Sequence, residues 1–416
     1  MTKDKEKRMT PEIRFKGFSG DWEQRKLNEI SDIYDGTHQT PKYQDEGVMF
    51  LSVENIKTLI SNKFISHEAF ESEFRIRPQR GDVLITRIGN VGTANVVETD
   101  ENLAYYVSLA LLKSEKLKPY FLQSSIQSPF VQKQIWKRTL HIAFPKKINK
   151  NEIGQVPINI PTTDEQVEIG TFFKHLDDAI TLHQQKYDHL IQLKKAYLDL
   201  MFPKNGESVP KIRFADFQDN WEQRKLSDVI EKLSGGASIK PTDYLEDGIR
   251  TIPKGAVSAT GIADLSGSKY ISEDFFEKNI TSHVHTNNLV TSLRDLVPSA
   301  PNMGRIVRIE GDDEQFLMPQ GVYKLELFKG MDEDFLISFS NSDKYRKIIS
   351  AEKNGSTQVH IRNGEFLNID INLPSKHEQK KIGTFFKILD NTITLHQKKI
   401  ASLKSLKQAY LQKMFV

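Results

Sequence analysis

Two long segments of the chain repeat the same spacing of apolar residues. In 169–201 and again in 382–414, apolar side chains recur at alternating steps of four and three positions. This heptad spacing places one apolar stripe along a helix and is typical of coiled coils. We therefore predict two long helices that share an apolar seam. The residues expected at the helix-pair interface are Ile169, Phe173, Leu176, Ile180, Tyr187 and Leu190 in the first helix and Ile382, Phe386, Leu389, Ile393, Ile400 and Leu403 in the second.

The expected start of each helix carries its own signal. Thr162 precedes Glu165 by three positions and Ser375 precedes Glu378 by three, which is the spacing of a capping box. The seam from 169 to 201 covers 201 − 169 = 32 steps, so at ~1.5 Å per residue it extends ~48 Å. That length exceeds one turn of duplex DNA, which is ~34–36 Å.

Four polar residues interrupt the predicted seam. They are His183, Lys194, His396 and Lys407. Such positions suggest metal binding or proton transfer, but no third ligand is visible in the sequence beside them. Polar seam residues more often fix the register of a helix pair or extend toward solvent, and we favour that interpretation.

Shorter apolar runs fill the rest of the chain and alternate as strands do. A helical stretch is expected late in each of two regions, at about 119–138 and 333–350. The expected strands are 48–53, 82–88, 93–98, 105–112 and 156–160 in the first region, and 249–253, 295–300, 305–309, 322–328 and 368–373 in the second. The pattern predicts an α+β protein with two related α/β-type domains.

The two halves of the chain are copies of each other at their ends but not between them. Pro11–Leu27 matches Pro210–Leu226 at an offset of 210 − 11 = 199. Glu165–Phe202 matches Glu378–Phe415 at an offset of 378 − 165 = 213. The inserts enclosed by these matches share little. Neutral drift after duplication would have blurred the flanks as well, so we interpret the repeat as one scaffold that holds two unlike recognition surfaces.

The order of these segments predicts how the helices pair. The first helix carries the chain from the first insert to the second, and the second helix, if it pairs with the first, must run back. We therefore expect an antiparallel coiled coil with internal pseudo-two-fold symmetry and a recognition domain at each end. The expected boundaries are 1–160 for the first recognition domain, 161–203 for the first spacer helix, 204–373 for the second domain and 374–416 for the second helix.

Composition narrows the classes of protein. The chain has 416 residues, 38% of them hydrophobic, and no cysteine, which excludes disulfides, thiolate nucleophiles and zinc-thiolate sites. No run reaches the roughly 18 apolar residues of a membrane helix, and the first ten residues lack the apolar core of a signal peptide. We expect a cytoplasmic protein without a membrane partner. The net charge of 58 − 55 = +3 means that any basic surface must be local.

Polar loops follow apolar runs at matching places in the two inserts. They lie at 86–92 and 138–147 in the first insert and at 299–305 and 354–362 in the second. Their side chains are of the types that contact base edges and phosphates, although a solvated turn is an equally good reading of any one residue. The candidate DNA-binding residues are Arg87, Asn90, Lys146, Lys147, Asn302, Arg305, Gln358, His360 and Arg362.

Three duplicated motifs resemble the specificity subunit of type I restriction-modification systems. They are WEQRKL at 22–27 and 221–226, EQxxIGTFFKxLDxxITLHQxK beginning at Glu165 and Glu378, and the AYLxxMF endings. The resemblance runs from about Pro11 to Phe415. It implies two target recognition domains, each reading one half of an interrupted, asymmetric site in double-stranded DNA, with the helices as a ruler between them.

The resemblance also implies the partners and the division of chemistry. In this family the subunit docks two adenine methyltransferase (M) subunits, and restriction (R) subunits can join. S-adenosylmethionine, ATP and Mg²⁺ are then expected in those partners, with no cofactor, metal or catalytic residue in this chain. The sequence agrees, because it contains no G-x-x-x-x-G-K-[ST] phosphate loop, no glycine-rich cofactor loop and no NPP[YF] signature.

Two other classes of protein fit the sequence less well. A standalone methyltransferase or nuclease conflicts with the missing cofactor motifs. A coiled-coil adaptor that binds only proteins would explain the helices but would leave two full-sized, divergent inserts without a purpose. We therefore predict a DNA sequence-recognition subunit that is not itself an enzyme, with the adaptor as the alternative.

Overall fold

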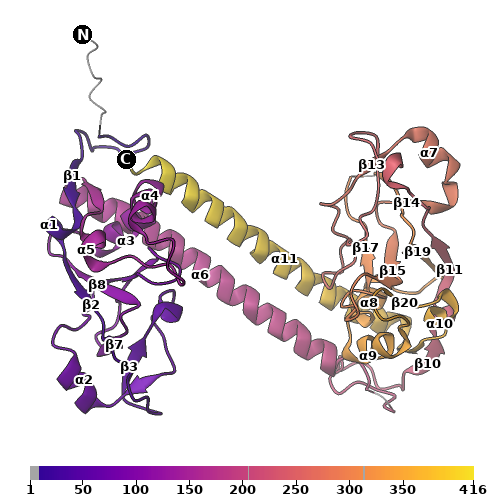
Figure 1. Ribbon diagram of the computed structural model, residues 1–416. Coiled ribbons are helices and arrows are strands. Elements are labelled where there is room, and N and C mark those ends of the chain that lie inside the picture. Colours follow the sequence, from indigo (N-terminus) through magenta and orange to yellow (C-terminus); the bar gives the residue numbers. More distant parts are fainter. Residues whose placement is uncertain (1–8, 205, 313) are drawn as a thin grey trace, which may run out of the picture. The chain divides into compact units, whose positions relative to one another are not determined.

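A computed structural model describes residues 9–204, 206–312 and 314–416. The chain divides into two compact units, described here separately. Unit 1 comprises the chain up to Gln184 together with Lys398–Val416, and unit 2 comprises Gln185–Gln397. Two long helices, α6 (Thr163–Leu200) and α11 (Lys376–Lys413), each contribute one end to each unit (Figure 1). The polar start of the chain, where no signal peptide is expected, lies largely outside the described residues.

Unit 1 is built around an antiparallel sheet with strand order β2-β8-β5-β6. A second sheet, β4-β3-β7, pairs β3 with β7 in parallel. The strands are β2 (Asp32–Asp35), β3 (Val48–Leu51), β4 (Phe64–Ile65), β5 (Val83–Thr86), β6 (Ala94–Val96), β7 (Leu103–Tyr105) and β8 (Leu109–Lys113). The helices are α1 (Leu27–Ile30), α2 (His67–Glu73), α3 (Pro119–Gln127), α4 (Pro129–Arg138) and α5 (Lys150–Gly154), with the 3-10 turn η1 (Val53–Asn55).

Unit 2 repeats the central sheet with the equivalent order β11-β19-β15-β17. Its other strands form two-stranded ladders. The strands are β11 (Ile230–Gly235), β12 (Ile249–Arg250), β13 (Tyr270–Ile271), β14 (His283–His285), β15 (Leu289–Ser292), β16 (Arg294–Asp295), β17 (Ile306–Arg308), β18 (Gln315–Leu317), β19 (Val322–Leu327) and β20 (Val359–His360). The helices are α7 (Glu273–Lys278), α8 (Glu333–Phe339), α9 (Asp343–Glu352) and α10 (Asn363–Leu367), with 3-10 turns η2 (Leu226–Asp228), η3 (Pro241–Asp243) and η4 (Ile280–Ser282).

The strand in each repeated WEQRKL motif pairs with the strand at the far end of its insert. In unit 1, β1 (Glu23–Lys26) pairs antiparallel with β9 (Pro157–Ile160), which ends the insert. In unit 2, β10 (Glu222–Lys225) pairs with β21 (Asp370–Leu373) in the same register. Both ends of each divergent insert are therefore anchored on constant sequence, which lets the insert change without moving its attachment points.

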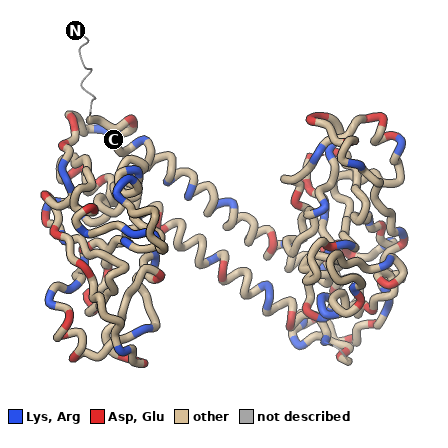
Figure 2. The backbone as a smooth tube through the Cα atoms, viewed as in Figure 1, with Lys and Arg blue, Asp and Glu red and all other residues tan. Residues whose placement is uncertain are grey.

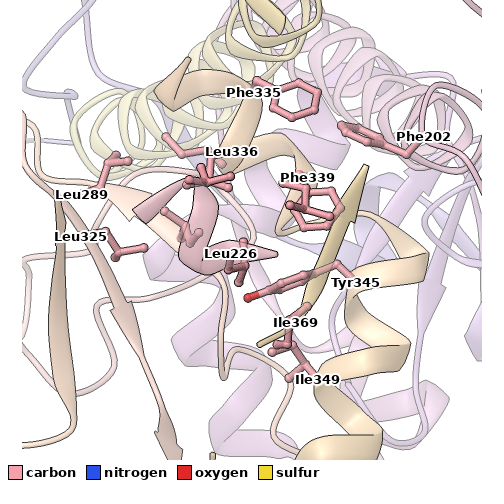
Figure 3. Packing of buried hydrophobic residues seen from close by; sticks show 14 of the residues in the cluster. Phe202, Leu226, Leu289, Leu325, Phe335, Leu336, Phe339, Tyr345, Ile349 and Ile369 are labelled. Carbon is pink, nitrogen blue, oxygen red and sulfur yellow. The ribbon is translucent and has the colours of Figure 1, made fainter. Parts of the chain in front are cut away.

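The tryptophans of the two WEQRKL motifs occupy equivalent cores. The ring of Trp22 meets Phe121 and the C-terminal Phe415 at centroid distances of 6.1 and 6.0 Å. Trp221 likewise meets Phe335 and Phe202, at 6.0 and 6.2 Å. Figure 3 shows Phe202, two residues after the end of α6, packed among the α8 side chains of the unit 2 core. The last turn of each long helix is thus part of a domain core, and its burial fixes the helix end.

Within each unit, the two long helices pair antiparallel, as the sequence predicts. In unit 1, the rings of Phe172 and Tyr410 meet at 5.0 Å, and further along α6 the side chain of Asp177 meets an earlier residue of α11, Lys407. In unit 2, Tyr197 and Phe385 meet at 5.1 Å in the same antiparallel sense. All twelve predicted interface residues are buried or half-buried.

Both helix starts carry half of the predicted capping box and an ion pair that was not foreseen. The backbone N–H of Glu165 donates to Thr162 Oγ1 over 3.4 Å. The carboxylate of Glu165, however, accepts two hydrogen bonds from the guanidinium of Arg14, at 2.6 and 2.7 Å. In unit 2, Glu378 accepts the same pair from Arg213, at 2.7 and 2.8 Å. The glutamates therefore tie each helix to the constant segment before its domain, which adds geometric specificity to the join.

Several expected elements have different bounds from those predicted. The helix expected at about 119–138 is broken into α3 and α4, because Pro129 lacks an N–H and Ser128 caps a new helix there. The helix expected at about 333–350 is similarly broken after α8, where the Ser342 hydroxyl accepts from the N–H of Tyr345 in α9. The single strand expected at 105–112 is two strands in different sheets.

Turn geometry explains the remaining differences among strands. The N–H of Leu109 donates to Tyr106 O in the turn that carries the chain from β7 to β8, and a continuous apolar run conceals such a turn. The strand expected at 295–300 is reduced to the last residue of β16, because prolines follow at 298 and 301. The strand that precedes this loop is instead β15, which lies wholly in the core.

Candidate nucleic-acid interface

Acidic and basic residues are interspersed over both units. Figure 2 shows Lys and Arg alternating with Asp and Glu along the backbone of each unit. The basic regions that can attract a polyanion are therefore local, as the net charge of +3 indicates. Two pairs of loops, one in each unit, hold the residues predicted to contact DNA.

In unit 1, the structure brings the two predicted loops side by side. Gly89 N–H, in the loop between β5 and β6, donates to Lys146 O over 2.8 Å, and Ile88 forms a β-bridge with Lys147. The second loop is itself a short hairpin, in which Leu140 N–H donates to Lys147 O over 2.7 Å. This hairpin, residues 139–147, is called the unit 1 hairpin below. Residues more than 50 positions apart in the chain thus form one surface.

Three of the four residues predicted in unit 1 are exposed on this surface. They are Asn90, Lys146 and Lys147. The Nδ2 of Asn90 donates to Thr93 Oγ1 over 3.2 Å. Lysine ammonium groups at such positions are suited to phosphate contacts, and an exposed asparagine is suited to an adenine edge.

The fourth residue, Arg87, is turned inward. Its side chain is 11% exposed and forms an ion pair with Asp35 of β2. Its Nε also donates to Ile148 O over 3.3 Å, at the end of the unit 1 hairpin. Arg87 therefore holds the hairpin against the sheet, and this geometry supports a positioning role in place of the predicted base contact.

Aromatic and cationic side chains stabilise the unit 1 hairpin. The rings of Trp136 and His141 lie 4.0 Å apart, and His141 Nε2 lies 2.9 Å from Trp136 O. Lys146 Nζ lies 4.6 Å from the centroid of the Trp136 ring, a cation–π contact. The hairpin is consequently a defined structure that projects from the sheet edge.

In unit 2, the equivalent loops also meet. Residues 294–295 pair with 359–360 as strands β16 and β20, and Ile361 N–H donates to Leu293 O over 3.0 Å. Lys353 Nζ donates to Pro298 O over 2.8 Å. Three predicted residues, Gln358, His360 and Arg362, are exposed on this pair of loops.

A hollow of about 430 Å³ lies between the two loops of unit 2. Three predicted residues line it, and the sequence analysis missed further polar side chains from β16 and the turns beside it. Amide and guanidinium groups with this convergence can form paired hydrogen bonds to base edges. The polar lining consists of Lys254, Ser292, Arg294, Asp295, Asn302, Gln320, Gln358 and His360, and so includes one acidic residue.

Arg305 resembles Arg87 in being turned inward. Its guanidinium donates to Asn341 and, over 3.1 Å from Nε, to Pro301 O. Burial, together with the like charge of Arg346, lowers the pKa of Arg305 to about 10, so it remains protonated at neutral pH. Arg346 also donates to Met303 O over 2.7 Å. The two arginines thus fix the loop from beneath, and this geometry supports a positioning role for Arg305.

A repeated glycine is a structural residue that the sequence analysis did not single out. A Cβ on Gly170 would lie 2.8 Å from Phe121 N, and a Cβ on Gly383 would lie 2.6 Å from Phe335 N. Each glycine lets a long helix approach the first turn of a domain helix. The signal was available, because both glycines stand in the IGTFFK repeat, but repetition alone does not indicate close packing.

The part of the chain that the structure describes contains neither a metal-binding cluster nor a helix able to span a membrane. Within residues 9–204, 206–312 and 314–416, no group of three or more His, Asp or Glu residues is placed to hold a metal ion. Over the same residues, no helix has both the length and the apolar character needed to span a bilayer.

Comparison with known families identifies the repeated scaffold. The sequence matches the model of the "Type I restriction modification DNA specificity domain" twice, over residues 19–192 and 218–405. Three relatives come from Methanocaldococcus jannaschii. The MjaVIII specificity subunit is 24% identical over 375 residues, which is 86% of this chain and 83% of that protein. The MjaIX specificity subunit is 22% identical, over 95% of this chain and 92% of that protein.

Solved structures share the fold. The type I restriction-modification S subunit from M. genitalium matches with a TM-score of 0.69 at 14% sequence identity. The match covers 98% of this chain and 99% of that one, so the similarity extends over both units.

Proposed function

Because the chain belongs to the type I restriction-modification DNA specificity family and its function is DNA target recognition, we propose that each unit reads one half of a bipartite, asymmetric target. The chain is a specificity subunit and not a catalytic one. The finer proposal concerns which residues read which half. Unit 1 would use Asn90 and the lysines of its hairpin, and unit 2 the polar residues around its hollow.

One observation carries this proposal. In both units, two loops of unrelated sequence come together at the same position of the same four-stranded framework. Constant sequence anchors both ends of each insert, through β1 with β9 and β10 with β21. A framework that is constant while its paired loops differ is suited to reading two different half-sites.

Two identical exposed surfaces support binding of the same partner twice. All four residues of the strand sequence EQRK are exposed in both β1 and β10. Leu182 on α6 and Leu395 on α11 are equivalent, since 395 − 182 = 213, and are 50% and 66% exposed. We therefore propose that two methyltransferase subunits dock, one per repeat, and that restriction subunits join them. S-adenosylmethionine, ATP and Mg²⁺ would be bound by those partners.

The test is to co-express the chain with the methyltransferase subunit of its operon and to map N6-methyladenine in the host genome by single-molecule sequencing. The expected result is one interrupted, two-part motif. Replacing residues 28–159 with the insert of another specificity subunit should change one half of the motif only. Replacing 227–372 should change the other half only.

The same experiment separates the alternative function. A pure protein adaptor predicts a stable complex in which neither replacement alters any methylation motif. Substituting Gln358→Ala in unit 2 provides a finer measurement, because loss of a paired base contact relaxes specificity at one position of one half-site by roughly 1–3 kcal/mol. A change in both half-sites would contradict the assignment of one half-site to each unit.

A further inference from the structure

The unit 1 hairpin ends in two apolar side chains that pack on nothing. Ile142 is 99% exposed and Phe144 is 104% exposed. Surface leucines and isoleucines are common, but an aromatic ring and a branched chain two positions apart at the tip of one loop are not explained by the fold. A side chain left in this position is expected to have a partner in the assembled complex.

The charge around the tip indicates what this partner is. Five basic residues and no acidic residue occur between 137 and 151. Lys146 and Lys147 directly follow the tip and are exposed. An apolar tip flanked along the chain by cations complements an apolar interior behind a phosphate backbone, which is the arrangement of base pairs in duplex DNA.

The hairpin is also held firmly enough to act on a stiff partner. The Trp136 and His141 rings lie in tilted contact, with centroids 4.0 Å apart, and Lys146 Nζ lies over the same indole ring. Arg87, through Asp35 and Ile148 O, attaches the hairpin to the central sheet. A loop held at three points can transmit binding energy into distortion of DNA, whereas an unsupported one would fold away.

We propose that Phe144, assisted by Ile142, inserts into the base stack of the half-site bound by unit 1 and opens one base step. This inference rests on the proposed function. Apolar wedges of phenylalanine, isoleucine or proline open base steps in this way and kink the duplex. Lys146 and Lys147 then lie at the phosphates beside the opened step. The half-site read by unit 1 is therefore selected in part by how easily that step unstacks, and flexible pyrimidine–purine steps are favoured.

The loop of unit 2 that corresponds to the hairpin has no apolar side chain at its tip, and the exposed apolar residues Leu296 and Val297, 70% and 46% exposed, lie on the neighbouring loop. The tip of the corresponding loop, residues 354–358, reads Asn-Gly-Ser-Thr-Gln and is polar and exposed. The distortion is therefore expected in one half of the target only. This asymmetry provides an internal control.

The experiment uses the complete complex of the chain with its methyltransferase subunits and a duplex that contains the mapped target. 2-Aminopurine is placed at single positions through each half-site, excluding the adenines that the partner methylates. The wild-type complex should raise the fluorescence at one step of the unit 1 half-site and at none in the unit 2 half-site. Phe144→Ala should abolish that rise and weaken binding roughly tenfold.

Two variants keep the result interpretable. Phe144→Leu retains an apolar wedge and should retain part of the fluorescence rise. Ile60→Ala removes another exposed apolar side chain of unit 1, 66% exposed, and should change nothing. If Phe144→Ala leaves every fluorescence signal unchanged while the wild type binds the target, the wedge is wrong and the proposed function stands.

The remaining outcomes also discriminate. If Phe144→Ala releases a methyltransferase subunit in native mass spectrometry, the tip is a protein contact and the proposal is overturned. If the wild-type complex binds no duplex at all, the proposed function itself fails and the wedge fails with it.

Discussion

Lys407 Nζ lies 2.6 Å from Asp177 Oδ1, joining the end of α11 to the beginning of α6 in unit 1. The repeat places the same two residue types at Lys194 and Asp390 in unit 2, since 407 − 194 and 390 − 177 are both 213, and their charged atoms lie 2.5 Å apart. The two lysines that interrupt the predicted seam are thus paired across it. A pair of this kind selects one register and the antiparallel direction.

Removing one partner of the Lys194–Asp390 pair should destabilise unit 2 strongly, whereas replacing both partners with apolar residues should not. Lys194 and Asp390 side chains are 11% and 13% exposed, so removing one partner leaves the other charge buried. Lys194→Met is expected to destabilise unit 2 by about 3–5 kcal/mol, whereas Lys194→Met with Asp390→Leu should recover most of that loss. Denaturant unfolding of the four members of this cycle measures both effects. Additive effects of the two substitutions would show that the pair does not couple the helices.

The unfolding free energy of unit 2 should depend on pH in part because Asp390 titrates. Burial raises the pKa of Asp390, against the opposing effect of Lys194. The folded state therefore binds this proton more tightly than the unfolded state does, and the contribution of Asp390 to stability is largest below its unfolded pKa and declines as the pH rises through its folded pKa. The unfolding free energy of the wild type minus that of Asp390→Asn should decline over this window.

For Asp216, an exposed aspartate in the same unit, stability should change with pH in the opposite direction. Hydrogen bonding to Lys381 lowers the pKa of Asp216. Its contribution is present above its unfolded pKa and is lost as the pH falls through its folded pKa, so the difference between the wild type and Asp216→Asn should grow as the pH rises. Equal slopes for the two variants would contradict the assignment to Asp390.

The glycine of the second IGTFFK repeat should tolerate no side chain. A Cβ on Gly383 would lie 2.3 Å from Asp332 Oδ1 and 2.6 Å from Phe335 N. Although alanine favours helices, Gly383→Ala should destabilise unit 2 by about 1–3 kcal/mol through overpacking. Gly364→Ala is the control, because nothing lies within 4 Å of its Cβ. Thermal unfolding of both variants measures the loss of stability. Equal losses in the two variants would contradict the close packing of Gly383 against α8.

The hairpin lysines should determine how binding depends on salt. If Lys146 and Lys147 each neutralise one phosphate, replacing both with alanine should reduce the slope of log K against log salt by about 1.8, at ~0.9 per contact. Lys278→Ala is the control, because Asp274 already pairs with this lysine at 2.6 Å. Titrations of the complete complex at several salt concentrations provide the measurement. An unchanged slope would place the phosphate contacts elsewhere.

The exposed leucines should determine the number of methyltransferase subunits. Leu182→Glu or Leu395→Glu alone should release one copy, because each replaces an apolar contact with a charge in one repeat. The double variant should release both copies. Native mass spectrometry reads the stoichiometry directly. Loss of both copies in a single variant would indicate that the subunits bind cooperatively or at one shared surface.

Periodicity and repetition predicted the two helices and the two divergent domains, and the order of these segments along the chain predicted the antiparallel pairing. These features are visible in the sequence because heptad spacing is a local property, and because a duplication compares the chain with itself. The repeat also carried the glutamates at 165 and 378 and the lysines at 194 and 407, but not the residues that they contact. The candidate loops were located in the same way, from polar runs after apolar ones.

Only the tertiary structure decided how these pieces are used. It brought residues 88 and 147 together, turned Arg87 toward Asp35, and left Phe144 exposed at the end of a supported hairpin. None of these facts has a local signature, because each depends on a partner far away in the chain or on the absence of one. Sequence determined which residue types were available at the candidate DNA-binding loops, and packing against the sheet of each unit decided which of them face outward.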